Sequence, residues 1–163
     1  MSADRPANPR PAKWLGALAA AIGIFLMLLG LGIVPAGKAN PNDPLWVGFV
    51  VGFVFLLAGL AVMLQDYAGA NERGEIPAGA PGWVRAAQSL IVFLIFISFA
   101  LIASYVALAG DARNFSGGIP FVGDATNVSI ARIVFGIGAL ICWAVAIAFA
   151  VARARKIIGG GEG

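Results

Sequence analysis

GFVVGFVFLLAG, residues 48–59, is the stretch that decides the fold. It lies inside an uncharged apolar run from Leu45 to Leu64. Gly48 and Gly52 form a GxxxG pair, and Gly59 follows seven residues after Gly52. In lipid, glycines at this spacing let another helix approach closely, so that dispersion holds the pair together. The stretch therefore predicts a transmembrane helix with a packing seam.

Composition extends this prediction to the whole chain. Of 163 residues, 60% are hydrophobic and 12% are charged, about half the charged fraction of a soluble domain. The apolar residues form four blocks, each close to the roughly 20 residues that cross hydrocarbon: Trp14–Val34, Leu45–Leu64, Arg85–Ala109 and Ile130–Ala152. We predict an all-α fold, a transmembrane four-helix bundle with antiparallel up-down-up-down topology, as a single domain over residues 14–156. Residues 1–13 should form a disordered cytoplasmic arm and residues 157–163 a disordered glycine-rich tail.

The distribution of basic residues predicts the orientation in the membrane. Eight lie in the segments on one side, and only Lys38, Arg113 and Arg132 lie on the other. Because cytoplasmic segments carry the excess of Lys and Arg, both termini should lie in the cytoplasm, with the chain in a bacterial inner membrane. The net charge of +3 follows from these helix-end cations, so we expect no nucleic-acid partner. The eight are Arg5, Arg10, Lys13, Arg73, Arg85, Arg153, Arg155 and Lys156.

The N-terminal segment also has features of a signal peptide. Basic residues precede an apolar run, and Gly37–Ala39 matches a weak cleavage site. The run from Trp14 to Val34 is longer than the roughly 7–15 residues of a signal peptide's apolar region. We therefore favour a retained first helix over a cleaved one.

Small residues predict which helices pack closely. In the first and second helices glycines fall within a series of alternating four- and three-residue spacings, which keeps them on one helix face. The series are Gly16, Ala20, Gly23, Met27, Gly30 and Gly48, Gly52, Phe55, Gly59, Val62. The fourth carries small residues at a strict spacing of four. The third has no glycine, and its phenylalanines should face lipid or a partner. The predicted packing residues are Gly16, Gly23, Gly30, Gly48, Gly52, Gly59, Gly138, Cys142 and Ala146.

Polar side chains within the spans define a candidate ligand cleft. Ser98 and Tyr105 are one heptad apart and so share a face of the third helix, and the indole of Trp143, near the middle of the fourth, needs a hydrogen-bond partner. These residues could orient a ligand beside the third helix. The alternative is structural, because serines in such helices commonly bond to a carbonyl of the preceding turn.

The segment between the third and fourth helices predicts an ion pair. Arg132 should lie at the start of the fourth helix, where the helix dipole disfavours a cation, so we expect Asp111 or Asp124 to pair with it. An anion site formed with Arg113 is the alternative. Asn127, or failing that Ser129, should be the N-cap. The glycosylation triplets at 114–116 and 127–129 are too close to the membrane to carry weight.

The sequence lacks the residue types that most membrane chemistry requires. There is no histidine, and Cys142 is the single cysteine, so histidine-ligated haem, an intrachain disulfide and a CxxC redox pair are excluded. No charged residue lies centrally in a span, whereas proton-coupled transport uses an intramembrane carboxylate. No carboxylate-rich metal motif or phosphate-binding loop appears. We expect no metal, no cofactor and no enzymatic activity.

Two segments carry a resemblance to a family. These are Asn114–Gly117, NFSG, and Arg132–Ala139, RIVFGIGA, which leads to Trp143. In them the chain resembles small, uncharacterised bacterial four-span integral membrane proteins, mainly over its second half, and this resemblance implies no activity.

The expected function is that of a non-catalytic membrane protein, an accessory, assembly or stabilising subunit of a larger complex. Its partners would be the lipid bilayer and either another membrane protein or further copies of itself. The alternative is a binder or carrier of a lipid or another hydrophobic small molecule in an interhelical cleft. We favour the first function because polar groups that could orient a ligand are few and scattered.

Overall fold

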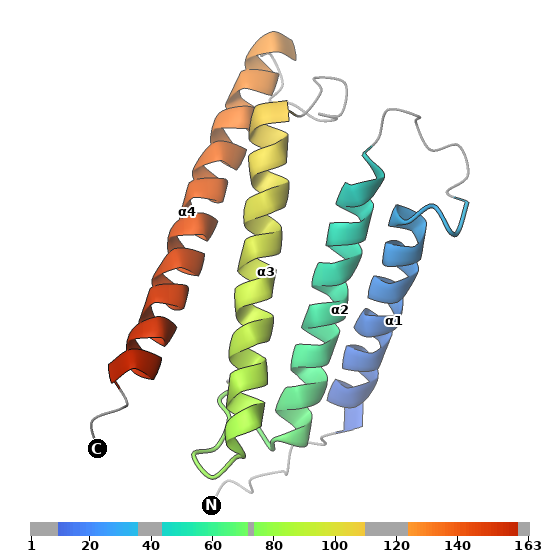
Figure 1. Cartoon of the computed structure of the whole chain (residues 1–163). Helices are drawn as coiled ribbons and strands as arrows, with labels where there is room; N and C mark the ends of the chain where they lie inside the picture. Colours follow the sequence, from blue (N-terminus) through green and yellow to red (C-terminus); the bar gives the residue numbers. More distant parts are fainter. Residues whose placement is uncertain (1–9, 36–43, 72–73, 110–123, 160–163) are drawn as a thin grey trace, which may run out of the picture. The chain divides into compact units, whose positions relative to one another are not determined.

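The computed structural model describes residues 10–35, 44–71, 74–109 and 124–159, with side chains for 13–35, 44–71, 74–109 and 126–155. This part of the chain is all-helical, and each helix is long and apolar enough to cross a membrane. These features indicate a multi-pass membrane protein. The four helices are α1 (Arg10–Gly30), α2 (Leu45–Tyr67), α3 (Gly82–Ala109) and α4 (Asp124–Gly159) (Figure 1).

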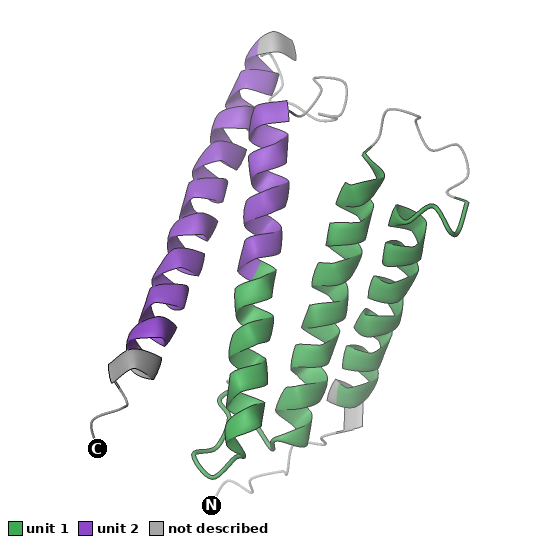
Figure 2. Ribbon diagram, viewed as in Figure 1, with its two compact units in different colours: residues 1–95 green, residues 96–163 purple. Residues whose placement is uncertain are grey.

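The chain groups into two compact units. Unit 1 comprises Met1–Ile95 and holds α1, α2 and the first half of α3, while unit 2 comprises Phe96–Gly163 and holds the second half of α3 with α4 (Figure 2). The boundary between the units falls inside α3. Each unit therefore pairs helices that are consecutive in the chain, as short connections favour.

In unit 1, α1 and α2 run in opposite directions with their backbones in contact. Gly16 of α1 lies against Gly59, Gly23 against Gly52, and Gly30 against Gly48 and Phe49. The residue numbers fall along α2 as they rise along α1, which defines an antiparallel pair. Because these glycines repeat every heptad, the contact continues along most of both helices.

Glycine-based caps end α1 and α2. Gly32 has φ +70°, its N–H donates to Leu29 O, and the N–H of Ile33 donates to Leu28 O. This pair of bonds is a Schellman motif, which needs a left-handed residue and so favours glycine. The same motif ends α2, where Gly69 has φ +66°. The cap explains why α1 ends at Gly30 and not, as predicted, at Val34.

The other helices also differ from their predicted bounds. α1 begins at Arg10, so the last residues of the predicted disordered arm are helical; Pro11 is tolerated there because the first turn leaves N–H groups unpaired. α2 continues to Tyr67 and α3 begins at Gly82. α4 covers Asp124–Gly159 and so exceeds the predicted 130–152 at both ends.

The start of α4 corrects the predicted N-cap. Asn127 and Ser129 both lie inside the helix, so neither caps it. The helix begins instead at Asp124, because an acidic residue in the first turn is favoured by the helix dipole. The apolar pattern alone did not reveal these first turns because their residues are polar.

In unit 2, α3 and α4 also pack antiparallel. A Cβ on Gly136 would lie 3.8 Å from Ala107 Cβ, and Trp143 contacts Ser104. Ala100 of α3 and Ala146 of α4 are buried. At Gly136 the pair is separated by an ordinary van der Waals distance, unlike the backbone contact of α1 with α2.

Candidate functional site

The backbones of α1 and α2 meet along the glycine seam, which is formed by Gly16, Gly23 and Gly30 of α1 and Gly52 and Gly59 of α2. A Cβ built on Gly23 would lie 2.7 Å from Gly52 O, and one on Gly59 would lie 2.6 Å from Ala20 N. Real Cβ atoms essentially never come so close to backbone, so only glycine fits. The seam contains backbone and small side chains, which makes it a packing surface and not a chemical site.

Gly48 differs from the other predicted glycines. A Cβ on Gly48 would lie 3.6 Å from Gly30 Cα, which is ordinary van der Waals contact. The predicted GxxxG pair is therefore unequal, since Gly52 lies against Gly23 while Gly48 has room for a methyl group. In this pair of helices the heptad spacing determines contact more than the GxxxG spacing does.

The stripe predicted on α4 is displaced. Gly138 has nothing within 4 Å of a built Cβ among the described atoms, and Ala150 is exposed. The buried residues are Ala139 and Ala146, with Cys142 half-buried between them. A spacing of four drifts by about 40° per step on a helix with 3.6 residues per turn. Alternation of three and four keeps residues 139, 142 and 146 on one face, so Gly138 falls outside it.

A charge pair joins α1 to α2 at one end of unit 1. Lys13 Nζ lies 3.1 Å from Asp66 Oδ2, and the Asp66 side chain is 9% exposed while that of Lys13 is 70% exposed. Asp66 Oδ2 accepts no well-aligned hydrogen bond from the described residues, so the contact is a charge–charge interaction. The span predicted from the sequence ended at Leu64 and so left Asp66 outside it, whereas α2 extends to Tyr67. Gly69 is a C-cap signal that could have placed Asp66 in the helix.

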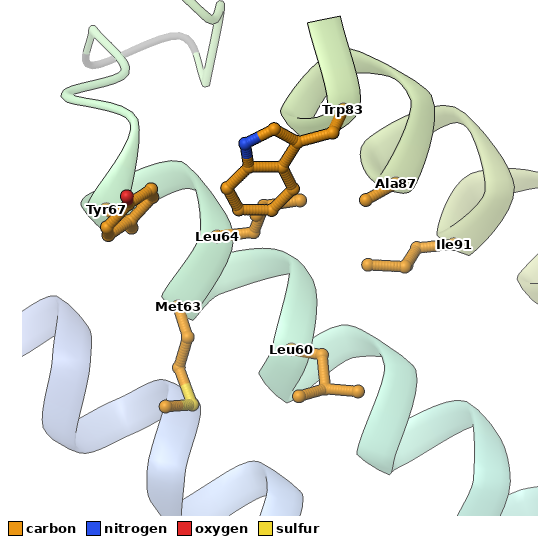
Figure 3. A pocket seen from close by; sticks show the side chains of 7 residues that line it. All are labelled: Leu60, Met63, Leu64, Tyr67, Trp83, Ala87 and Ile91. Carbon is orange, nitrogen blue, oxygen red and sulfur yellow. The ribbon is translucent and has the colours of Figure 1, made fainter. Parts of the chain in front are cut away.

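The same end of unit 1 contains an apolar groove between α2 and the start of α3 (Figure 3). Its volume is about 350 Å³. The rings of Tyr67 and Trp83 lie at one end with centroids 5.9 Å apart and planes tilted by 42°. The apolar pattern of the sequence did not reveal this groove. Tyr67 and Trp83, at helix ends on either side of a polar link, are a sequence signal that could have indicated it. The lining residues are Leu60, Met63, Leu64, Tyr67, Trp83, Ala87 and Ile91.

The link between α2 and α3 is an ordered turn in its described residues. The side-chain amide of Asn71 donates to Glu75 Oε2 at 2.7 Å, and the N–H of Glu75 donates to Asn71 Oδ1 at 2.9 Å. Arg85 of α3 donates to Ala80 O at 3.3 Å. These bonds close the connector and help to hold the ends of α2 and α3 beside the groove.

The predicted cleft residues all belong to unit 2. Ser98 is buried, Tyr105 is half-buried, and Trp143 is 37% exposed. The Trp143 indole N–H donates to Ser104 Oγ at 3.2 Å. Ser104, next to Tyr105 in the chain, is thus the partner that the indole required, and the bond joins α3 to α4.

The predicted ion pair falls mostly outside the described residues. Asp111 and Arg113 lie outside them, and of Asp124 only the backbone is described. Arg132 lies two turns inside α4 and not at its N-terminus. The dipole effect falls off within the first turn, so it no longer supplies the reason for pairing, and the pairing stays a prediction.

Comparisons of the chain with known protein families, characterised proteins and solved structures found no match. The resemblance to bacterial four-span membrane proteins therefore stays a prediction. No group of three or more residues suited to a metal ion occurs in the described part of the chain. What the described residues present is a packing seam, an apolar groove and long apolar helix faces.

Proposed function

We propose that this chain is a non-catalytic integral membrane protein that acts as an accessory, assembly or stabilising subunit of a larger membrane complex. The observation that carries the proposal is the glycine seam. It makes α1 and α2 a closely packed hairpin whose interior leaves no room for a ligand at Gly23 and Gly52. A rigid hairpin has little conformational freedom to lose when it binds a partner.

The outward faces of the helices supply the interaction surface. In each apolar span only 11% to 17% of the residues are buried within the chain. Large apolar side chains such as Leu18 and Phe25 of α1 and Phe99 of α3 are about half exposed or more. Such faces pack equally well against lipid or against another transmembrane protein, including a second copy.

The proposal includes an arrangement in the membrane. The four helices would form an antiparallel up-down-up-down bundle in a bacterial inner membrane, with both termini in the cytoplasm. The antiparallel contacts within each unit and the excess of basic residues on one side support this arrangement. The absence of histidine and of a central charge in any span supports a role without catalysis.

Extraction of the tagged chain in a mild detergent, followed by mass spectrometry, tests the proposal. We expect a stoichiometric protein partner, recovered equally well with Gly48→Ala and poorly with Gly23→Ala. The two substitutions are chemically identical, but only the second forces the hairpin apart. A chain that is recovered as a monomer with one defined lipid or quinone contradicts the proposal.

The apolar groove favours a second candidate, a binder of lipid or another hydrophobic small molecule. Its lining is almost wholly apolar, and the aromatic rings of Tyr67 and Trp83 close one end. Ala87→Leu should fill it and abolish recovery of a bound molecule. Ala86→Leu is the matched control, since Ala86 is exposed and lies outside the lining. Equal recovery from both variants would exclude the groove as the site.

A further inference from the structure

Cations gather where α4 leaves its apolar span. Arg153, Arg155 and Lys156 lie within four consecutive positions, and the helix continues past them to Gly159. From Ala125 to Gly159 the helix contains no acidic residue. The C-terminal half of α4 therefore carries basic residues and no acidic ones.

Two of these cations, Arg153 and Arg155, lie on different faces of the helix. Successive residues are about 100° apart around an α-helix, so Arg153 and Arg155 lie on nearly opposite faces. Both side chains are exposed, and the Arg153 guanidinium lies 5.6 Å from the centre of the Phe149 ring. A single protein partner covers one sector of a helix, whereas a layer of lipid headgroups surrounds it.

The spacing of charges along α4 supports placing Arg153 at the level of the lipid headgroups. Arg132 and Arg153 are 21 residues apart with no charged residue between them, which is about 32 Å of helix. The hydrocarbon core of a bilayer is about 30 Å thick. If Arg132 lies at one boundary of the hydrocarbon core, Arg153 therefore lies at the other. There the guanidinium of arginine can reach the headgroups while its methylene groups stay in apolar surroundings.

We propose that Arg153 and Arg155 bind the phosphate headgroups of anionic phospholipids around the end of α4. Juxtamembrane cations attract anionic lipid surfaces in this way, and guanidinium groups bind phosphate through paired N–H donors. This inference rests on the transmembrane placement in the proposed function but not on a protein partner. Lipid binding and partner binding can therefore fail independently of each other.

Native mass spectrometry of the full chain, titrated with dioleoyl phosphatidylglycerol or dioleoyl phosphatidylcholine, tests it. We expect the chain to prefer phosphatidylglycerol, and Arg153→Gln with Arg155→Gln to reduce that preference. Each cation near an anionic surface contributes about fivefold, so the double variant should lose on the order of 25-fold. Arg153→Lys with Arg155→Lys keeps both charges and should retain most of the preference.

The matched control is Arg5→Gln with Arg10→Gln, which removes the same net charge from the N-terminal segment and should have a much smaller effect. Circular dichroism shows that each variant is folded. An equal loss in the control, or an unchanged preference in the α4 variant, would overturn the proposal. So would displacement of the lipid by inorganic phosphate beyond that produced by chloride at the same ionic strength.

Discussion

At Gly23 the absence of a side chain lets two helix backbones meet. A methyl group there would lie 2.7 Å from Gly52 O and closer still to Leu56 N. Both neighbours are backbone atoms, which cannot move without moving α2. The seam therefore requires that the side chain at this position be a single hydrogen atom, so even substitution by alanine should disturb it.

Gly23→Ala should lower the free energy of unfolding by about 1–3 kcal/mol, the usual cost of overpacking. Gly48→Ala, on the same helix pair, should change it by less than about 1 kcal/mol, because its methyl meets only ordinary contacts. Unfolding in detergent followed by circular dichroism measures both. Equal losses would show that the glycines act through helix propensity and not through contact.

The Lys13–Asp66 pair is asymmetric because only the carboxylate is buried. Lys13→Gln leaves that carboxylate without its partner, whereas Asp66→Asn leaves a lysine in water. Lys13→Gln should therefore destabilise by about 1–2 kcal/mol more than Asp66→Asn does. Unfolding of both single variants and the double variant in a mutant cycle measures this difference. A double variant as unstable as Lys13→Gln would show that the buried Asp66 carboxylate is not the cause of the loss.

At the scale of elements, the helices follow two different packing rules. α1 and α2 contact backbone to backbone because their glycines keep a heptad spacing. α3 and α4 contact where Gly136 lies near Ala107 and through a side-chain hydrogen bond from Trp143 to Ser104. The second pair therefore depends on a polar contact that a single substitution can remove.

Ser104→Ala removes the partner of the Trp143 indole and should destabilise the chain by about 0.6 kcal/mol, the average for interhelical hydrogen bonds in a membrane protein, and by at most about 1.7 kcal/mol. Ser89→Ala is the matched control. Its hydroxyl donates to Arg85 O in its own helix at 2.8 Å, so its loss should have little effect. Thermal unfolding in detergent distinguishes the two, and a larger loss from Ser89→Ala would contradict the role of the α3–α4 bond.

At the scale of the whole molecule, the described residues contain four helices that can cross a membrane, and four crossings would place both termini on one side. The excess of basic residues predicts that this side is the cytoplasm. A phosphatase reporter fused after Gly163 should therefore be inactive, and a fluorescent reporter that matures in the cytoplasm should be bright. Fusions after Gly117, in the segment between α3 and α4, should give the opposite pattern, and matching patterns at both positions would refute the topology.

The sequence by itself determined that the chain is helical and where its spans lie, because burial in lipid requires long apolar runs with internally paired backbones. It also identified Gly16, Gly23, Gly30, Gly52 and Gly59, since the seam repeats with the helix period. It placed the ends of α1 and α4 wrongly, because caps depend on backbone conformation and polar first turns carry no apolar signal. Only the tertiary structure decided that Gly48 has room for a methyl group, that Ala139 and not Gly138 is buried, and that Tyr67 and Trp83 close a groove. These features depend on distances between segments remote in the chain, which no local pattern encodes.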